Sequence, residues 1–275
     1  MTVRDVLRDA TERLAAAGVG SPRVDAELLL AHVLDVPRGA LITQDAPQGE
    51  QRLRFEELLL RRERREPLQH ILGRVHFRHV ELAVGPGVFV PRPETELLVD
   101  AVLPFLQAGD VAVDLCSGSG ALAVALADEV PGARVIAVER SAGALPWLHR
   151  NAEGTGVEVV AADVTDPVPL APLGGLVKAV VSNPPYVPAG VAVDAEVHAD
   201  PAEAVFGGTQ GLDLVPSVIS RAAELLRPGG VFALEHDESH GAAVPRLFAQ
   251  DGRWQDVLVH PDLTGRTRYT TATRA

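Results

Sequence analysis

The sequence of 275 residues has few cysteine, lysine, methionine and aromatic residues. Its single cysteine, Cys116, excludes an internal disulfide framework and is typical of a reducing compartment. No apolar run approaches the roughly 20 residues that a membrane-spanning helix needs, and the N-terminus carries acidic residues early, unlike a signal peptide. We therefore expect a cytoplasmic protein that does not enter a membrane.

An excess of positive charge is also absent. The net charge is −12, and Lys178 is the only lysine, so arginine carries nearly all of the positive charge. Extensive nucleic-acid binding requires clustered Lys and Arg, so the composition argues against direct nucleic-acid binding. For the arginine-rich run over residues 61–66 we expect a solvated helix end, the alternative being a docking patch for an acidic partner.

The sequence divides into three parts by the spacing of its apolar residues. Residues 1–72 show apolar residues at helical spacing, with helices expected to begin near Thr2, Ser21 and Gly49, which predicts a small helical bundle. Residues 73–92 change to period two and predict a linking β-hairpin that turns at residues 85–87. Residues 93–275 alternate strand, turn and helix, which predicts a mainly parallel sheet covered by helices on both faces.

One short stretch cannot continue the strand that precedes it. The apolar run that ends at Val181 and Ser182 is followed by Asn183, Pro184, Pro185 and Tyr186. The prolines remove two backbone donors, so the carbonyl groups of Asn183 and Pro184 stay free to accept hydrogen bonds. Together with the tyrosine ring they predict a planar slot for an NH2 group on a flat carbonyl or ring. The alternative is a strand-terminating turn without chemistry.

Polar residues and glycines collect where the predicted parallel strands end, which is the edge at which such sheets bind ligands. They are Asp114, Gly118, Gly120, Glu139, Asp163, Asn183 and Glu235. Gly118 and Gly120 allow a close backbone approach to a ligand at a helix N-terminus, and Glu139 lies where an acid accepts ribose hydroxyls.

Two cofactors compete for this edge. The pattern of Gly118, Gly120 and Ala123 also satisfies a dinucleotide fingerprint, so a nicotinamide enzyme is an alternative. Asp114 would place its charge where a pyrophosphate lies, and the slot at Asn183 has no part in hydride transfer. A ligand with a cationic centre, ribose and adenine but no phosphate fits Asp114 and Glu139 better, which predicts S-adenosylmethionine.

Three motifs carry a resemblance to known families. Residues 114–120, Asp-Leu-Cys-Ser-Gly-Ser-Gly, resemble motif I of the Rossmann-like methyltransferases, and Asn-Pro-Pro-Tyr at 183–186 resembles the branch that methylates amino groups. Phe-Val-Pro-Arg-Pro-Glu-Thr-Glu at 89–96, preceded by Glu-Pro-Leu-Gln-His-Ile-Leu-Gly at 66–73, looks like the HemK/PrmC family. The likeness runs from about residue 66 to the C-terminus.

The resemblance implies a fold, an activity and a set of site residues. The fold would be a class I S-adenosylmethionine-dependent methyltransferase with a seven-stranded sheet, and the N-terminal bundle would recognise the substrate. The activity would be methylation of the glutamine of the Gly-Gly-Gln motif in class 1 peptide chain release factors, without a metal. The cofactor would be bound by Asp114, Cys116, Ser117, Gly118, Ser119, Gly120, Glu139, Asp163, Val164 and Asn183. The substrate would be bound by Arg92, Glu94, Asn183, Pro184, Pro185 and Tyr186, of which Asn183, Pro184 and Tyr186 are the expected catalytic residues.

The sequence departs from the family pattern at two positions. Cys116 stands where this family usually has glycine, and we expect a buried small side chain there and no nucleophile. Val164 stands where some members have an aromatic residue against the adenine, so the adenine wall would be weaker or supplied elsewhere. Two other functions stay open: methylation of an amino group on a DNA or rRNA base, and nucleotide binding without catalysis.

Overall fold

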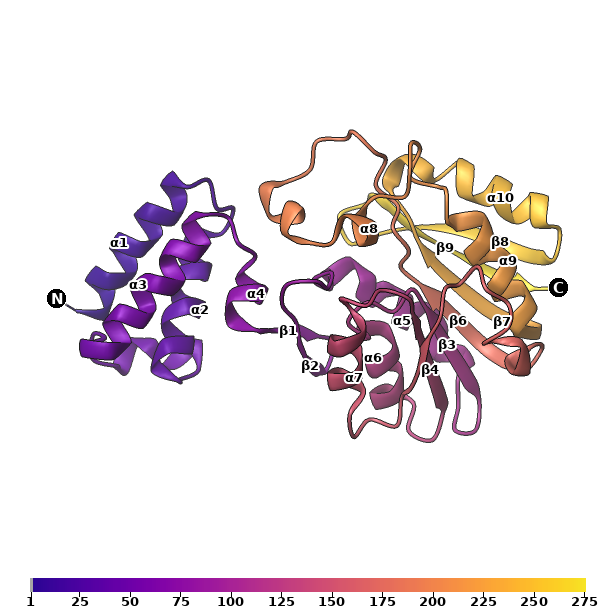
Figure 1. The fold of residues 1–275 in the computed structure, drawn as a ribbon, viewed down its shortest axis with the longest axis horizontal. Helices are drawn as coiled ribbons and strands as arrows, with labels where there is room; N and C mark the ends of the chain where they lie inside the picture. Colours follow the sequence, from indigo (N-terminus) through magenta and orange to yellow (C-terminus); the bar gives the residue numbers. More distant parts are fainter. Residues whose placement is uncertain (1) are drawn as a thin grey trace. The chain divides into compact units, whose positions relative to one another are not determined.

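The computed structural model describes residues 2–275, which form two compact units (Figure 1). The first, which we call the helical unit, takes residues 2–74 together with Val193–Ala199. The second, the sheet unit, takes Val75–Ala192 and Asp200–Ala275. No helix among the described residues is long and apolar enough to cross a membrane.

The helical unit is a small bundle with its own apolar core. Its elements are α1 (Val3–Ala16), α2 (Pro22–Leu34), η1 (Arg38–Thr43), α3 (Gly49–Glu63) and α4 (Leu68–Leu72). Helix α1 begins at a capping box, in which the Thr2 side chain and the Asp5 carboxylate each bond the other's backbone N–H. A proline in the first turn of α2 fits a position that lacks an intrahelical partner for its N–H.

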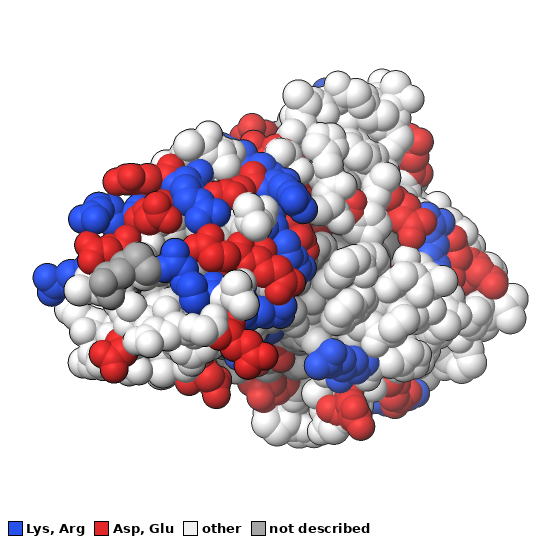
Figure 2. Space-filling model, turned by 60° about the vertical axis from the view of Figure 1, so that its left-hand side comes forward, with Lys and Arg blue, Asp and Glu red and all other residues white. Residues whose placement is uncertain are grey.

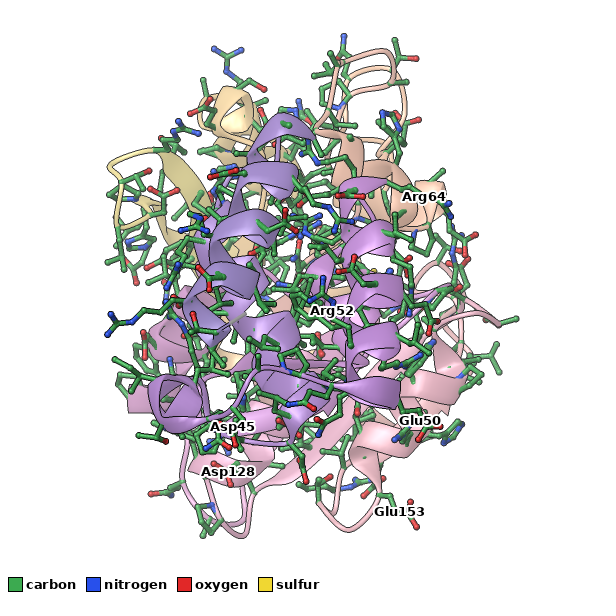
Figure 3. The ribbon with its side chains drawn as sticks, turned by 90° about the vertical axis from the view of Figure 1, so that its left-hand side faces the viewer. Asp45, Glu50, Arg52, Arg64, Asp128 and Glu153 are labelled. Carbon is green, nitrogen blue, oxygen red and sulfur yellow. The ribbon has the colours of Figure 1, made fainter. Side chains whose placement is uncertain are left out.

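The arginine run after α3 differs from the solvated helix end that the sequence predicts. Arg62 is only 3% exposed, and its guanidinium donates to Asp25 Oδ2 at 2.7 Å and to Glu196 Oε1 at 2.7 Å. Arg64, labelled in Figure 3, is the one residue of the run 61–66 that is exposed, and the others are partly or fully buried. Arg62 is buried because two carboxylates and the Glu66 carbonyl satisfy its donors, a long-range pairing that residue spacing does not reveal.

The hairpin between the bundle and the sheet has a different turn from the one expected. Strand β1 (Arg74–Phe77) pairs with β2 (Val80–Ala83), and the turn falls at Arg78 and His79, with Arg78 at φ 51°. The chain also turns at residues 85–88, where the Val88 N–H donates to the Gly85 carbonyl at 3.3 Å, but residues 88–90 form no strand, so the expected hairpin about residues 85–87 is wrong. The alternation of apolar and polar residues is interrupted once, between Phe77 and Val80, and this interruption is the turn of the hairpin.

The sheet unit contains one seven-stranded sheet in the order β5-β4-β3-β6-β7-β9-β8. The strands are β3 (Val111–Leu115), β4 (Arg134–Glu139), β5 (Glu158–Ala161), β6 (Val177–Ser182), β7 (Leu226–Glu235), β8 (Trp254–Pro261) and β9 (Thr267–Arg274). Strands β3 to β7 run parallel to one another, and β9 pairs antiparallel with both β7 and β8. The predicted mainly parallel sheet is confirmed.

Helices cover both faces of this sheet. They are α5 (Glu96–Val102), α6 (Ala121–Glu129), α7 (Leu145–Ala152), α9 (Val215–Leu225) and α10 (Ala243–Asp251), with the short α8 (Ala202–Val205) in the loop after β6. The remaining 3-10 turns are η2 (Pro93–Thr95), η3 (Leu103–Phe105), η4 (Ala171–Leu173), η5 (Ala195–Ala199) and η6 (Glu238–His240). Leu98, Leu122 and Leu148 pack in one core cluster, and Ile219 and Phe248 pack in the other.

The strand order puts the carboxyl ends of β4, β3 and β6 side by side. Asp114 is in register with Ala137 of β4 and Val181 of β6, and Leu115 is in register with Ser182. The chain leaves β3 in the centre and adds strands on both sides of it, which is the switch point at which open parallel sheets bind ligands.

Candidate active site

The turn after β3 carries a buried carboxylate without a partner. Asp114 is 0% exposed, and among the described residues neither of its carboxylate oxygens has a hydrogen-bond partner. Burial raises the pKa of Asp114 to about 8, and the nearby Glu139 charge adds to the rise. An unpaired buried acid of this kind fits a cationic ligand group that would pair with it.

The backbone of this turn is left-handed at three places. Cys116, Gly118 and Gly120 have φ values of 64°, 56° and 86°. The left-handed backbone at Cys116 explains why glycine suits this position, since glycine has no Cβ to strain it. The thiol is partly buried, and burial raises its pKa, so Cys116 is protonated and poorly nucleophilic. A Cβ at Gly120 would lie 2.6 Å from Leu148, so this glycine is required by packing as well.

Glu139 joins the end of β4 to this turn. Its carboxylate accepts the Gly118 N–H at 2.8 Å, the Arg140 N–H at 2.8 Å and the Ser141 N–H at 2.7 Å. A carboxylate offers about four lone-pair sites, so these bonds hold it in place and leave capacity for a further donor such as a sugar hydroxyl. The serines of the turn are structural in part: Ser117 Oγ donates to the Asp114 carbonyl at 2.9 Å, and the Ser119 carbonyl accepts from Asn151 at 2.9 Å.

Two further residues expected at the cofactor follow β5. Asp163 accepts from Arg140 at 2.9 Å and from the Thr165 hydroxyl and N–H, and these bonds lower the pKa of Asp163 to about 2. Val164 is 4% exposed and packs in the core between the sheet and α9, while its carbonyl accepts from Arg221 at 3.0 Å. The ionised Asp163 therefore stands at the strand end, and Val164 contributes mainly packing.

The slot after β6 has the polar groups that the sequence predicts. Asn183 Nδ2 donates to the Thr95 hydroxyl at 3.2 Å, which directs Oδ1 away from Thr95. No backbone hydrogen bond among the described residues ends on the carbonyl oxygen of Asn183 or Pro184, so both remain available as acceptors. The hydroxyl of Tyr186 donates to Glu235 Oε1 at 2.8 Å, which anchors the tyrosine ring.

A glycine-rich segment supports the slot from behind. After Tyr186 the chain pairs with residues 205–208, through Val187 N–H to Val205 O and Gly207 N–H to Val187 O, both at 2.9 Å. A Cβ at Gly207 would lie 2.4 Å from the Pro185 carbonyl, and one at Gly211 would lie 2.1 Å from the Tyr186 carbonyl. These glycines let the backbone pack directly against the slot and keep its shape.

Arg92 and Glu94, both expected to bind substrate, differ in their surroundings. Arg92 pairs with Asp200 at 2.5 Å and lies over the Phe89 ring, 4.9 Å from its centroid. The Asp200 side chain is fully buried and also accepts the Val90 N–H at 3.1 Å, so it joins the segment before α5 to the loop after β6. Glu94 is partly buried and lies close enough to raise the pKa of both Tyr186 and Glu235.

Sequence reasoning assigned no role to three residues that support the slot or the segment around Arg92: Thr95, Asp200 and Glu235. Thr95 lies within the motif at 89–96, and Glu235 was expected at the ligand edge of the sheet with no role of its own. Asp200 belongs to a loop rich in acids, from which its burial could not be singled out. No cluster of three or more His, Cys, Asp or Glu side chains suited to a metal is present among residues 2–275.

Comparisons with known proteins agree with both parts of the chain. Residues 5–73 match the family described as the PrmC N-terminal domain, and residues 80–202 match the methyltransferase small domain. A release factor glutamine methyltransferase of Mycolicibacterium smegmatis is 52% identical over 99% of this chain and 98% of its own length. One of Streptomyces coelicolor is 50% identical over 97% of this chain and 96% of its own length.

Two further similarities broaden this picture. A 4-amino-L-phenylalanine/4-methylamino-L-phenylalanine methyltransferase of Streptomyces pristinaespiralis is 40% identical over 94% of this chain and 91% of its own length. The solved structure of a T. thermophilus 16S rRNA N2 G1207 methyltransferase superposes with a TM-score of 0.52 at 24% identity, covering 74% of this chain and 50% of that one. At that identity the structural likeness shows the fold alone.

Proposed function

Because the chain belongs to the family of release factor glutamine methyltransferases, we propose that it methylates the glutamine side-chain nitrogen in class 1 peptide chain release factors. The target is the glutamine of the Gly-Gly-Gln motif, the cofactor is S-adenosylmethionine, and the reaction takes place in the cytoplasm. The observation that carries the proposal is the Asn183 slot beside a buried, unpaired Asp114 in a chain 52% identical to such an enzyme over nearly its whole length.

The slot addresses the main chemical difficulty, which is that an amide nitrogen is a weak nucleophile because its lone pair is delocalised into the carbonyl. Asn183 Oδ1 and the Pro184 carbonyl accept the two N–H groups and hold the nitrogen in one direction; such orientation can supply several kcal/mol. Tyr186 packs beside the flat amide. S-adenosylmethionine, when bound, would supply the methyl group from its electrophilic sulfonium centre, the methyl–sulfur bond breaking to leave neutral S-adenosylhomocysteine.

Charge at the slot favours the same reaction. The glutamine nitrogen gains positive character as its bond to the methyl carbon forms, and acceptors placed at both N–H groups stabilise that charge. One N–H proton then leaves to water, so the product amide is neutral and no dedicated base is needed. Asp114 would hold the cationic end of the cofactor, and Glu139 would accept from its ribose.

We assign substrate recognition to the helical unit and to the segment around Arg92 and Glu94. The helical unit matches a domain family of its own, separate from the methyltransferase domain, which supports a role other than methyl transfer. On the face drawn in Figure 2, basic and acidic side chains are interspersed over this unit. Mixed charge of this kind suits a protein partner better than a phosphate backbone.

The test offers the purified protein radiolabelled S-adenosylmethionine and one acceptor at a time. The acceptors are a class 1 release factor, the same factor with the Gly-Gly-Gln glutamine replaced by alanine, DNA, ribosomal RNA, and 4-amino-L-phenylalanine. We expect label on the intact release factor alone. Label on a nucleic acid or on the free amino acid, with none on the release factor, would contradict the proposal.

A further inference from the structure

The loop after β6 is rich in acids that the reaction as described does not use. It begins at the slot, and its acidic residues are Asp194, Glu196, Asp200 and Glu203. Its middle, Val193–Ala199, belongs to the helical unit, while the flanking residues belong to the sheet unit. The chain thus runs from the slot into the unit to which we assign substrate recognition, and then returns.

Two arginines of the helical unit hold the middle of this loop. One oxygen of Glu196, Oε1, accepts from Arg62 Nη2 at 2.7 Å and from Arg65 Nε at 3.0 Å. Arg62 is itself fixed, because its Nε donates to Asp25 Oδ2 at 2.7 Å and its side chain is only 4% exposed. Hydrogen bonds between charged groups are stronger than those between neutral groups, and here one of the two donors is already held in place. Glu196 therefore attaches the loop firmly within the helical unit.

Two more acids attach the same loop within the sheet unit. Asp200, whose side chain is fully buried, pairs with Arg92 at 2.5 Å. Glu203 Oε1 accepts the Ser141 hydroxyl at 2.7 Å, and the Ser141 N–H in turn donates to Glu139, the acid that we assign to the ribose. Three different acids therefore attach the loop within the helical unit, at Arg92 and at the cofactor edge of the sheet.

The base of the loop is closed without Glu196. The Val187 N–H donates to the Val205 carbonyl and the Gly207 N–H donates to the Val187 carbonyl, both at 2.9 Å. These bonds lie directly after the slot, so loss of the attachment at Glu196 would free the middle of the loop and leave the slot formed. The base and the middle of the loop are therefore held by separate contacts.

We infer that Glu196 is a positioning residue for the protein substrate: its bonds to Arg62 and Arg65 keep the loop after β6 ordered where the release factor docks. The residues that flank the target glutamine must lie beside the slot, and this loop begins there, directly after Tyr186. A loop without the attachment would have to be ordered on binding, which lowers the affinity for the release factor. The identity of the substrate rests on the proposed function, but the attachment is a property of this chain alone.

Three variants separate the attachment from general effects on the loop. Glu196→Ala removes the attachment, and Asp194→Ala is its matched control, because it removes an exposed carboxylate two residues away. Arg65→Ala removes one of the two bonds to Glu196 from the other side. Arg65 also donates to the Gly18 carbonyl at 2.8 Å, so the effect of Arg65→Ala is compared with and without Glu196.

Hydrogen exchange measures the attachment without any substrate. The Val197 N–H lies in η5 next to Glu196 and donates to the Asp194 carbonyl at 2.9 Å, a backbone bond that neither substitution removes. After correction for intrinsic rates, its exchange should be at least about tenfold faster in Glu196→Ala and within about twofold of the unchanged protein in Asp194→Ala. The N–H groups of Val187 and Gly207 at the base should be unaffected in both. Equal Val197 exchange in Glu196→Ala and the unchanged protein would overturn the inference.

Kinetics show whether the attachment serves the substrate. In Glu196→Ala the KM for the release factor should rise about tenfold, while kcat and the KM for S-adenosylmethionine should change less than about twofold. Asp194→Ala should match the unchanged protein. An unchanged KM for the release factor, or a loss confined to kcat, would overturn the inference, because a defect of the slot itself would lower kcat.

The combination of two substitutions isolates the contact. Arg65→Ala should raise the Val197 exchange rate and the KM for the release factor by a larger factor in the unchanged protein than in Glu196→Ala. Equal factors in the two backgrounds would overturn the inference, since Arg65 would then act without Glu196. If Glu196→Ala does not fold, Val197 exchange in Arg65→Ala that equals that of the unchanged protein would overturn it. If the unchanged protein transfers no methyl group to the release factor, the proposed function fails, while the exchange measurements still decide whether Glu196 holds the loop.

Discussion

Asp114 should make cofactor binding depend strongly on pH. Its pKa is raised to about 8 because the carboxyl is fully buried, so the acid is mostly protonated in the ligand-free protein at neutral pH. A cationic ligand group requires the ionised form of Asp114. The apparent affinity is therefore proportional to the fraction of Asp114 that is ionised. With a pKa of about 8 for Asp114, the affinity for S-adenosylmethionine should rise about tenfold per pH unit between pH 5.5 and 7.5.

The window stops at about pH 7.5 because the α-amino group of the cofactor itself titrates near pH 8. Isothermal titration calorimetry at several pH values, with Asp114→Asn and Asp128→Asn in parallel, measures the effect. Asp128 is exposed on α6 and is labelled in Figure 3, so its substitution should leave the pH dependence intact. Asp114→Asn should bind more weakly and lose that dependence. An affinity for the unchanged protein that is constant over this window would refute the reasoning.

The same shift predicts the stability of the ligand-free protein. Because the pKa of Asp114 is about 8 in the folded state against a model value of 3.8, the folded protein holds one more proton between these values. The contribution of Asp114 to the free energy of unfolding is complete below about pH 4 and falls by about 1.4 kcal/mol per pH unit up to about pH 8, roughly 6 kcal/mol in all. Asp114→Asn should lack this loss and be the more stable protein at pH 8, as urea unfolding would measure.

Three other substitutions test the slot and the helical unit. Asn183→Ala should retain cofactor binding and lose methyl transfer; a collapse of cofactor affinity with unchanged turnover per bound cofactor would refute its role, as paired calorimetry and transfer assays would reveal. Gly211→Ala should lower the free energy of unfolding by about 2 kcal/mol and reduce turnover, because the new Cβ would lie 2.1 Å from a carbonyl of the slot. Gly190→Ala, with φ +88° but open space around it, separates this clash from backbone strain. Arg62→Ala should lower the free energy of unfolding by about 3–5 kcal/mol, because it leaves a buried carboxylate unpaired. The exposed Arg64→Ala should lower it by less than about 0.5 kcal/mol, as thermal unfolding would measure. Equal losses in the two variants would argue against the buried pair.

The sequence predicts the sheet and its ligand edge well because both depend on local signals. Apolar strands that end in Asp114, Glu139 and Asn183 are visible as runs and stops, and the right topology follows from the alternation of strands and helices. The prediction of the hairpin was wrong because a two-residue turn barely interrupts the alternation of apolar and polar residues. The pattern therefore made its two strands look like one. The local pattern locates strands better than it locates the short turns between them.

Long-range pairs explain most of what the sequence could not supply. Arg62 contacts Glu196, which lies 134 residues away in the chain, and Arg92 contacts Asp200, 108 residues away. Glu235 is buried because Tyr186 satisfies one of its oxygens, a partner 49 residues distant. An acid in a loop and an acid in a core look alike in sequence, and only the fold shows which of them has a partner.

The slot by itself does not choose the substrate. Free carbonyl acceptors and the Asn183 oxygen suit any planar group that carries NH2, and a relative 40% identical to this chain is named for an aromatic amine, 4-amino-L-phenylalanine. A glutamine amide and an aromatic amine share the flat, conjugated nitrogen that we propose the acceptors to hold, so discrimination between them should come from contacts around it. We assign recognition of the substrate to Arg92, which Asp200 fixes, and to the helical unit, neither of which takes part in the proposed methyl transfer. Selection of a release factor should therefore depend on these parts, while the rate of transfer should depend on Asn183 and the carbonyl acceptors of the slot.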